Sequence, residues 1–255
     1  MKKMICLLLS VLCLFAAVAL AADSDTVVGK GKLVVGITDF APMDYKDANG
    51  NWIGFDADVA RLFAASLGIE AEFVEIDWDN KVLELNAGSI DCVWNGMTLT
   101  DEVLSSMECS KAYANNAQVV ILPIAKAEAM DDTSELENLT YAVEAGSAGE
   151  AVINERGWSS TPVKAQADAL MEVAAGTSDA AVIDALMAAA MVGEGTGYAN
   201  LAYTFALNSE EYGVGFRKGS DLAEKLNAFM KDAYDSGKLL EVAKTYGVEA
   251  AIVAQ

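Results

Sequence analysis

Residues 54–76 read GFDADVARLFAASLGIEAEFVEI and contain the pattern from which the architecture follows. In the first half, apolar side chains recur at the spacing of a helix with one buried face, at Val59, Leu62, Phe63 and Leu67. Asp56 is of a residue type that caps the start of a helix, and Gly68 is of a type that ends one. The second half, Ile69 to Ile76, predicts a strand. The stretch therefore predicts one helix followed directly by one strand.

The same alternation continues on both sides of this unit. The apolar run Leu33 to Ile37 predicts a strand, and the turn-rich stretch Thr38 to Asn51 separates it from the helix. Downstream, Trp78 to Ala87 has helical spacing and ends at Gly88, and Ile90 to Trp94 predicts a short buried strand. The order strand, helix, strand, helix, strand is typical of a parallel sheet covered by helices.

A second run of alternating elements follows. Its predicted members are strand Gln118 to Leu122, strand Thr140 to Val143, helix Gly149 to Glu155, helix Asp168 to Ala175, strand Ala180 to Ile183 and helix Ala185 to Val192. Polar, strand-like segments at Tyr113 to Ala117 and near Ala206 to Tyr212 connect the two runs, which predicts two lobes sharing a hinge. A last strand, Val214 to Arg217, and two helices, Ser220 to Ser236 and Leu239 to Tyr246, complete the pattern.

Residues 1–21 have the features of a secretory signal peptide. A positive end, Lys2-Lys3, precedes the apolar run Ile5 to Ala19, and Ala19-Leu20-Ala21 fits a small-residue cleavage site. We therefore expect cleavage after residue 21 and a soluble protein in the periplasm or another extracytoplasmic space. A retained membrane anchor is the alternative, although the run is shorter than the ~20 apolar residues of a spanning helix. A lipid anchor on Cys13 is disfavoured by the bulky residue before it.

The composition excludes several classes of function. The chain has 38 acidic and 17 basic residues, and its formal net charge of −21 becomes −23 once Lys2 and Lys3 are removed. Because such a chain repels phosphate backbones, nucleic acid is not an expected partner. The sequence has no histidine, which excludes Ser-His-Asp and Cys-His catalysis and removes the commonest zinc ligand. We expect no metal and no cofactor.

Cys92 and Cys109 are the cysteines that remain after cleavage. An exported pair can form a disulfide in an oxidising compartment. Both residues lie in apolar runs, where a cysteine also serves as a small buried hydrophobic residue, so the sequence leaves both states open.

The segment Gly54-Phe55-Asp56-Ala57-Asp58-Val59 resembles the Gly-Phe-Asp-x-Asp-Leu signature of the polar amino-acid family of bacterial extracellular solute-binding proteins, family 3, which serve ABC importers. The resemblance runs in order through nearly the whole mature chain. The other matching motifs are Leu33-Val34-Val35-Gly36, Asp77-Trp78-Asp79, Ser89-Ile90-Asp91, Gly96 to Thr100, Ala145-Gly146-Ser147, Ser178 to Asp184 and Glu211 to Gly219.

The resemblance implies the two-lobed periplasmic-binding-protein fold of type II. Each lobe would be an α/β unit, a mostly parallel sheet flanked by helices, and two hinge crossings would join the lobes. Lobe 1 would comprise residues 22–114 plus 208–255, and lobe 2 residues 115–207, after the signal peptide at 1–21. The ligand would be trapped between the lobes at the carboxyl ends of the strands, where open α/β sheets generally place it.

Two aromatic residues match ligand-contacting positions of the family. Phe40 matches the aromatic that covers the ligand, although its loop is one residue shorter here, and a place in the lobe core is an equal alternative. Trp78 matches a position that packs against the ligand's side chain. A rigid aromatic face buries a large area and can also stack on a cation.

Asn95, Gly96 and Thr98 match the loop that grips the amino and carboxylate groups of the ligand. We expect this loop to connect the strand Ile90 to Trp94 with a helix beginning near Thr100, which would leave its backbone groups free. The amide and the hydroxyl can each donate or accept hydrogen bonds. A generic strand-to-helix turn would be polar as well, which is the alternative interpretation.

Ser147 and Asp184 complete the expected ligand-binding residues. Ser147 opens a helix, whose N-terminus stabilises an anion such as a carboxylate. Asp184 ends an apolar strand and matches the aspartate that pairs with the ligand's ammonium, for which a carboxylate gives charge-assisted hydrogen bonds. The alternative role for Asp184 is a helix N-cap.

The sequence departs from the family pattern at Val103. In the family, an arginine at this position clamps the ligand's α-carboxylate with two parallel hydrogen bonds, a geometry that other residues do not reproduce. No basic residue lies between Lys81 and Lys111. Carboxylate binding would therefore rely on backbone N–H groups or a displaced cation, or else the ligand has no α-carboxylate.

We therefore expect a monomeric binding protein, not an enzyme, that captures a small polar ligand, above all an amino acid, and delivers it to the permease subunits of an ABC importer. An amine or another ligand without an α-carboxylate is the first alternative. The second is an enzyme on this scaffold, because some relatives that the chain resembles dehydrate cyclic acids with a carboxylate general acid, a role open to Asp184 or Glu84. A third class of function is that of a ligand-sensing module. We expect a role in transport rather than in sensing.

Overall fold

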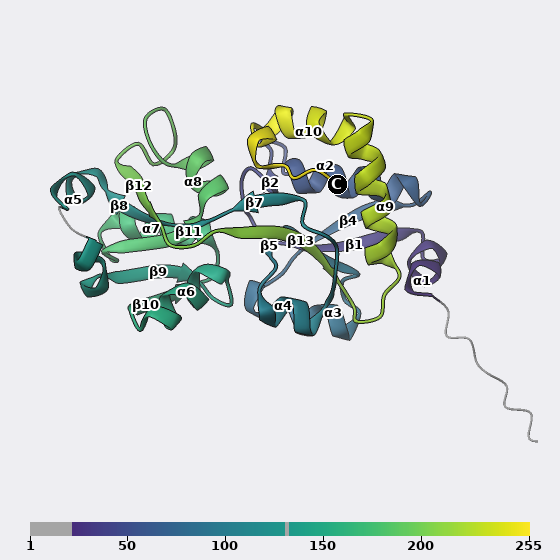
Figure 1. Cartoon of the computed structure of the whole chain (residues 1–255), viewed down its shortest axis with the longest axis horizontal. Helices are drawn as coiled ribbons and strands as arrows, with labels where there is room; N and C mark the ends of the chain where they lie inside the picture. The colour runs from purple at the N-terminus through teal and green to yellow at the C-terminus, as the bar shows by residue number, and fades with distance from the viewer. Residues whose placement is uncertain (1–21, 131–132) are drawn as a thin grey trace, which may run out of the picture.

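The computed structural model describes residues 22–130 and 133–255, so the predicted signal peptide lies outside the described residues. Figure 1 shows two α/β halves, which we call lobe 1 and lobe 2, joined by the extended chain around β7 and β13. Lobe 1 is built on a six-stranded sheet and lobe 2 on a five-stranded sheet. The α/β fold class is confirmed. Within the described residues no helix has the length and apolar character needed to cross a membrane.

Lobe 1 has the strand order β4-β1-β5-β13-β6, and β7 also pairs with β13. Its strands are β1 (Lys32–Ile37), β4 (Glu70–Glu75), β5 (Cys92–Thr98), β6 (Glu108–Cys109), β7 (Ala114–Asn116) and β13 (Glu210–Phe216), beside a small hairpin of β2 (Tyr45–Lys46) and β3 (Trp52–Ile53). Its helices are α1 (Asp23–Gly29), α2 (Phe55–Ser66), α3 (Lys81–Ala87), α4 (Asp101–Ser106), α9 (Leu222–Asp235) and α10 (Lys238–Tyr246), with short 3-10 turns at Trp78–Asn80 and Glu249–Ala251.

Lobe 2 has the strand order β10-β9-β11-β8-β12. Its strands are β8 (Gln118–Pro123), β9 (Thr140–Glu144), β10 (Ser159–Val163), β11 (Ala180–Asp184) and β12 (Leu201–Ala206). Its helices are α5 (Ile124–Ala129), α6 (Ala148–Arg156), α7 (Gln166–Ala175) and α8 (Ala185–Met191), with a 3-10 turn at Thr133–Asn138.

β1 shows why the central strands read as unbroken apolar runs. Leu33, Val35 and Ile37 belong to the same core cluster as Phe63 of α2. The intervening Val34 belongs to a different cluster, which includes Leu85 of α3. Because side chains alternate between the two faces of a strand, helices must cover both faces, and every position then favours an apolar residue.

The two crossings between the lobes are tied to each other by hydrogen bonds. The first joins β7 to β8, and the second joins β12 to β13 through residues 207–209. The Leu207 N–H donates to the Gln118 carbonyl at 2.8 Å, and the Gln118 N–H donates to Asn208 Oδ1 at 2.7 Å. The chain thus passes between the two sheets at the two segments expected from the sequence.

Each sheet is mixed, with a parallel part and antiparallel strands. β1 pairs in parallel with β4 and β5, and β9 pairs in parallel with β10 and β11. β13 runs antiparallel to β5, and β8 runs antiparallel to β11. β8 and β13 each follow a crossing, so they begin at the edge of the sheet at which the parallel strands end. That edge is where the two lobes face each other.

Asp56 does not cap α2, and this expectation from the sequence was wrong. The N-cap position of α2 is Gly54, with a φ of 131°, and no side chain caps it. Asp56 is instead fully buried, and its Oδ2 accepts hydrogen bonds from the Gly96 N–H at 2.6 Å and the Tyr113 hydroxyl at 2.7 Å. The helix start is therefore tied to β5 rather than exposed to solvent.

The segment from Asn95 to Thr98 was expected to be a loop but lies within β5. The pairing of β5 with β13 is irregular here, with a register shift between Gly213 and Gly215. Gly96 has a φ of +56°, which bends the strand. The strand therefore continues to the cleft, and its irregular end carries the residues that were assigned to a loop.

Cys92 and Cys109 are both free, which answers the question that the sequence left open. Cys92 lies on β5 and Cys109 on β6, and β13 lies between these strands. Two strand spacings of about 4.8 Å place the cysteines about 10 Å apart, beyond the reach of a disulfide. Burial raises the pKa of the Cys109 thiol to about 11.

Gly54 permits a close backbone contact that a larger residue would break. A Cβ at this position would lie 2.1 Å from the Met43 carbonyl oxygen, whereas a Cβ at Gly50 would meet nothing within 4 Å, although both residues have positive φ. We expect Gly54→Ala to lower the free energy of unfolding by at least about 3 kcal/mol, and Gly50→Ala by only about 1 kcal/mol. Urea unfolding followed by circular dichroism measures both. Equal losses would contradict the steric argument.

Candidate ligand-binding cleft

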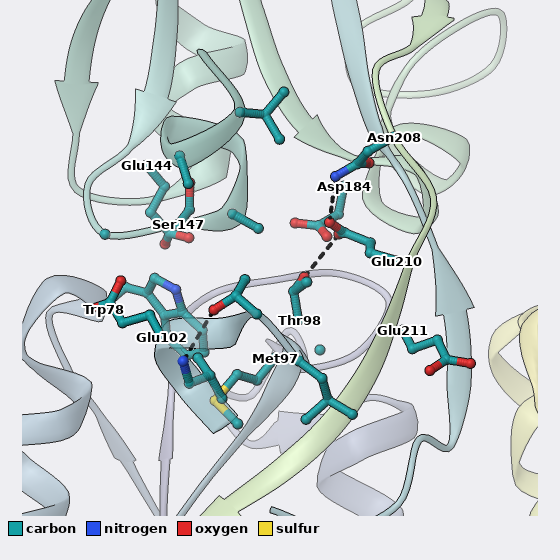
Figure 2. A pocket seen from close by; sticks show the side chains of 18 of the residues that line it. Trp78, Met97, Thr98, Glu102, Glu144, Ser147, Asp184, Asn208, Glu210 and Glu211 are labelled. Carbon is teal, nitrogen blue, oxygen red and sulfur yellow. Dashed lines mark hydrogen bonds between the residues drawn. The ribbon is translucent and has the colours of Figure 1, made fainter. Parts of the chain in front are cut away.

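A cavity of about 990 Å³ lies between the two lobes. Its walls come from the ends of β5, β9 and β11, from the turn that precedes α6 and from the crossing before β13. Figure 2 shows that side chains from both lobes and from the crossing point into this space. The cavity is therefore at the carboxyl ends of parallel strands from both sheets, the usual place for a ligand in an open α/β fold.

Six of the seven residues expected to bind the ligand line this cavity: Trp78, Asn95, Gly96, Thr98, Ser147 and Asp184. The seventh, Phe40, is not among the described residues that line it. Phe40 is 2% exposed and packs edge-on against Tyr212, with the ring centroids 6.4 Å apart. A Cβ at Gly96 would lie 2.3 Å from Phe40 Cε1. Phe40 thus lies behind the bent end of β5, in the core position that the sequence allowed as its alternative.

Asn95 has its side chain turned toward Thr38 at the end of β1. Its Oδ1 accepts from the Thr38 N–H at 2.9 Å, and its Nδ2 donates to Thr38 Oγ1 at 2.8 Å. The amide therefore fixes the ends of two neighbouring strands. Thr98 is oriented differently, because its hydroxyl donates to Glu210 Oε1 at 2.9 Å (Figure 2).

Asp184 and Glu210 form a pair of carboxylates where the chain crosses between the lobes. Asn116 and Gln118 each donate to both carboxylates, and the Tyr212 hydroxyl donates to Asp184 Oδ1 at 2.6 Å. Burial, followed by the charge of Glu210, raises the pKa of Asp184 to about 7. A cation placed beside Asp184 would favour its charged form.

The alternative role of Asp184 as a helix cap is wrong. Asp184 occupies the N-cap position of α8, but its side chain forms no capping hydrogen bond. Its Oδ2 instead accepts from the Gln166 side chain, whose Oε1 accepts from the Asp184 N–H at 2.9 Å. The carboxylate is thus held from several sides while it still lines the cavity.

Glu144 was missed by the sequence analysis. It ends β9, is 3% exposed, and its Oε1 has no hydrogen-bond partner in the part of the chain that the structure describes. Burial and the charge of Asp184 raise the pKa of Glu144 to about 8, while Lys81 lowers it. Like Asp184, Glu144 is a carboxylate directly after an apolar run, so the same pattern would have found it.

Lys81 is a second residue that the sequence analysis did not select. It begins α3, is 8% exposed, and its Nζ donates to the Gly146 carbonyl at 2.8 Å and to the Trp78 carbonyl at 3.3 Å. The Trp78 carbonyl is on lobe 1 and the Gly146 carbonyl on lobe 2, so the ammonium spans the cleft. It also lies 5.0 Å from the centroid of the Trp78 ring. Burial lowers the pKa of Lys81.

Ser147 caps α6. Its Oγ accepts from the Glu150 N–H at 3.1 Å, and Glu150 Oε2 accepts from the Gly146 N–H at 2.8 Å. The first N–H groups of any helix have no partner within the helix, and in α6 these groups belong to Ala148 and Gly149, at the start of the helix beside the cavity.

The described residues that line the cavity are strongly acidic. The basic ones are Lys81 and Arg156, and Arg156 is occupied at the rim, where its guanidinium donates to the Leu207 carbonyl at 2.8 Å. The acidic ones are Asp101, Glu102, Glu144, Glu155, Asp184, Glu210 and Glu211. Such an excess of negative charge attracts a ligand with net positive charge. Val103, where the family pattern has an arginine, packs against Trp78 in an apolar cluster.

These features describe a two-lobed α/β protein with an acidic cavity between its lobes. The family model for bacterial extracellular solute-binding proteins, family 3, matches residues 33–249, and the chain belongs to this family. Its sequence is similar to that of the arginine-binding extracellular protein ArtP of Bacillus subtilis strain 168, with 28% identity over 254 residues that cover 96% of this chain and 98% of the relative.

Two solved structures are also similar. A substrate-binding protein of an ABC uptake transporter from Streptococcus pneumoniae, with bound histidine, has a TM-score of 0.83 and 26% identity, covering 91% of this chain and 98% of that one. The ancestral amino-acid-binding protein AncCDT-1, a precursor of cyclohexadienyl dehydratase, has a TM-score of 0.79 and 28% identity, covering 88% and 98%. Both likenesses support the type II two-lobed fold.

Glu144 generates a prediction for stability. Its pKa in the folded protein, about 8, lies above its ordinary value of 4.5, so the stabilising effect of the neutral carboxyl is complete below pH 4.5 and is lost as the pH rises through 8. Glu144→Gln stays neutral. We expect the variant to become more stable than the wild type as the pH rises, by about 2 to 4 kcal/mol at pH 9.

Urea unfolding at pH 5, 7 and 9 measures this difference. Glu211→Gln is the matched control, because it neutralises an exposed carboxylate that also lines the cavity, and it should follow the wild type within about 0.5 kcal/mol. A constant gap between Glu144→Gln and the wild type across the pH range would show that Glu144 does not titrate as described.

Proposed function

We propose that this protein captures an α-amino acid with a cationic side chain between its two lobes and delivers it to the permease subunits of an ABC importer. The observation that carries the proposal is the acidic character of the cleft, in which seven acidic residues face two basic ones. An amino acid with an uncharged side chain has no net charge. A basic amino acid carries one net positive charge, which suits an acidic cavity. ArtP of Bacillus subtilis, by its name an arginine-binding protein, supports this choice.

In this proposal the predicted site residues have distinct roles. Asp184, with Glu210, binds the α-ammonium, and Thr98 orients Glu210 through its hydroxyl. Trp78 provides an apolar face for the ligand's side chain, and Asn95 with Gly96 shapes the end of β5. Ser147 caps α6, and the first N–H groups of that helix donate hydrogen bonds to the carboxylate. Phe40 supports the site from behind Gly96.

The lobes in this proposal keep the boundaries expected from the sequence. Lobe 1 comprises residues 22–114 plus 208–255, and lobe 2 comprises residues 115–207, so that the two crossings serve as the hinge. The mature protein is a soluble extracytoplasmic monomer released after cleavage of residues 1–21. Closure of the lobes buries the ligand, and the closed form is the one that docks on the permease.

An amine that lacks the α-carboxylate is a second candidate ligand, favoured by Val103. The apolar side chain at this position leaves no guanidinium to pair with a carboxylate. An enzymatic role is not proposed, although AncCDT-1 is described as a precursor of a dehydratase. Of the two acids considered from the sequence, Glu84 is outside the described cavity lining and accepts from the Ser89 hydroxyl.

Isothermal titration calorimetry of the mature protein with L-arginine tests the proposal. We expect saturable binding of one ligand per protein, and an unchanged ligand when the mixture is analysed by mass spectrometry after incubation. Asp184→Ala should weaken binding by more than about 1 kcal/mol, because the ammonium loses a charged partner in a site shielded from water.

Glu155→Gln is the control for this titration, because it neutralises an exposed carboxylate on the rim of the cavity, and it should weaken binding far less than Asp184→Ala does. No binding of any basic amino acid would overturn the proposed function. Equal affinity of Asp184→Ala and the wild type would remove Asp184 from the site. Conversion of the ligand would point to the enzyme alternative.

A further inference from the structure

Lys81 is a buried cation that forms no ion pair with the described residues. No Asp or Glu oxygen of the described residues lies within 4.0 Å of its Nζ, whereas Lys30, Lys164 and Arg217 each have one within that distance. The side chain is 8% exposed. A buried charge is costly unless an opposite charge or hydrogen bonds compensate it, so the position is one where a bound anion would be stabilised.

The hydrogen bonds of Lys81 leave one donor available. An ammonium group has three N–H donors, and two of them are directed at the carbonyl oxygens of Gly146 and Trp78. The remaining donor has no acceptor among the described residues. Because Lys81 lines the cavity, this donor is available to a ligand there.

The N-terminus of α6 lies next to this ammonium. Nζ is 2.8 Å from the carbonyl oxygen of Gly146, the residue before the N-cap Ser147. α6 has nine residues, and the positive end of its dipole favours an anion. Two independent features, an ammonium with a free donor and no ion pair, and the helix N-terminus, therefore favour an anionic group at the same place in the cleft.

The opposite side of the cavity favours positive charge. Figure 2 shows Ser147 and Trp78 on one side and the Asp184–Glu210 pair on the other. A single ligand that reaches both sides carries an anionic and a cationic group. An α-amino acid has this arrangement, whereas a plain amine offers only the cation.

We propose that Lys81 binds the α-carboxylate of the ligand, together with the N-terminus of α6, and so takes the role that Val103 cannot perform. This inference rests on the proposed function and deepens it, since it restricts the ligand to molecules that keep the carboxylate. Burial lowers the pKa of Lys81, and the acidic groups of Glu102, Glu144, Asp79 and Glu150, none of which forms an ion pair with its Nζ, oppose this effect.

Lys81 has an alternative role as a latch, because its bond to Gly146 joins the two lobes. The two roles are separated by comparing L-arginine with agmatine, its decarboxylated analogue. A latch stabilises closure over either ligand, so its loss would weaken both equally. A carboxylate-binding residue affects only the ligand that has the carboxylate.

Calorimetry on Lys81→Met provides the test. We expect the variant to bind L-arginine at least about tenfold more weakly than the wild type does, and agmatine within about threefold of the wild-type affinity. Lys81→Gln, which is also neutral but keeps a donor for the Gly146 carbonyl, should show the same ligand-dependent split. It provides the measurement if Lys81→Met does not fold, which thermal melting reveals.

Lys164→Met is the matched control. Lys164 also joins the lobes, through an ion pair with Asp77 at 3.3 Å, but its side chain is 65% exposed and it does not line the cavity. Its loss should change the affinity for both ligands by the same small factor. Equal weakening of both ligands by Lys81→Gln, or no weakening of arginine, overturns the role of Lys81 while leaving the proposed function intact. A wild type that binds neither ligand overturns both.

Discussion

The arrangement of the cleft depends on two carboxylates held side by side where the chain crosses between the lobes. Asp184 and Glu210 share the donors Asn116 and Gln118, and these donors lie on β7 and β8, on either side of the first crossing. Asp184 is buried and Glu210 is partly buried, and two like charges so close together are unfavourable unless a proton or a cation lies near them. The same contacts that connect the two lobes therefore create a site that a ligand ammonium would complete.

The rest of the cleft is arranged around this pair by the sheet topology. Parallel strands in both lobes end at the cleft, while β8 and β13 begin there. The ends of strands carry backbone groups and side chains that no neighbouring strand covers, so polar residues gather where the lobes meet. The positive groups, Lys81 and the start of α6, lie apart from the carboxylate pair. The cavity therefore separates positive from negative groups, in addition to having an acidic lining overall.

The sequence predicted the parts of the structure that depend on local patterns. Apolar runs such as Leu33 to Ile37 located the central strands, because burial on both faces leaves a continuous apolar signature. β10 and β12 were missed, since they are partly exposed edge strands without such a run. The expectation that Asp56 caps a helix failed because its partners, Gly96 and Tyr113, are distant in the sequence.

In the candidate site, too, local sequence patterns predicted some residues, whereas long-range contacts define the others. Trp78 and Asp184 were selected because they follow apolar strands within recognisable motifs. Lys81 was not, because its character as a buried cation arises only when Gly146 of the other lobe approaches it. Glu210 likewise becomes a partner of Asp184 only through the second crossing, which brings the two together from different elements. Contacts between the lobes join residues that are far apart in the sequence, and the local periodicity of apolar residues does not predict them.

A crystal structure of the mature protein grown with L-arginine would show both ends of the bound ligand at once. We expect the ammonium between Asp184 and Glu210, and the carboxylate within hydrogen-bond distance of Lys81 Nζ and the first N–H groups of α6. A ligand bound in the reverse orientation, or outside the space between the lobes, would contradict this expectation.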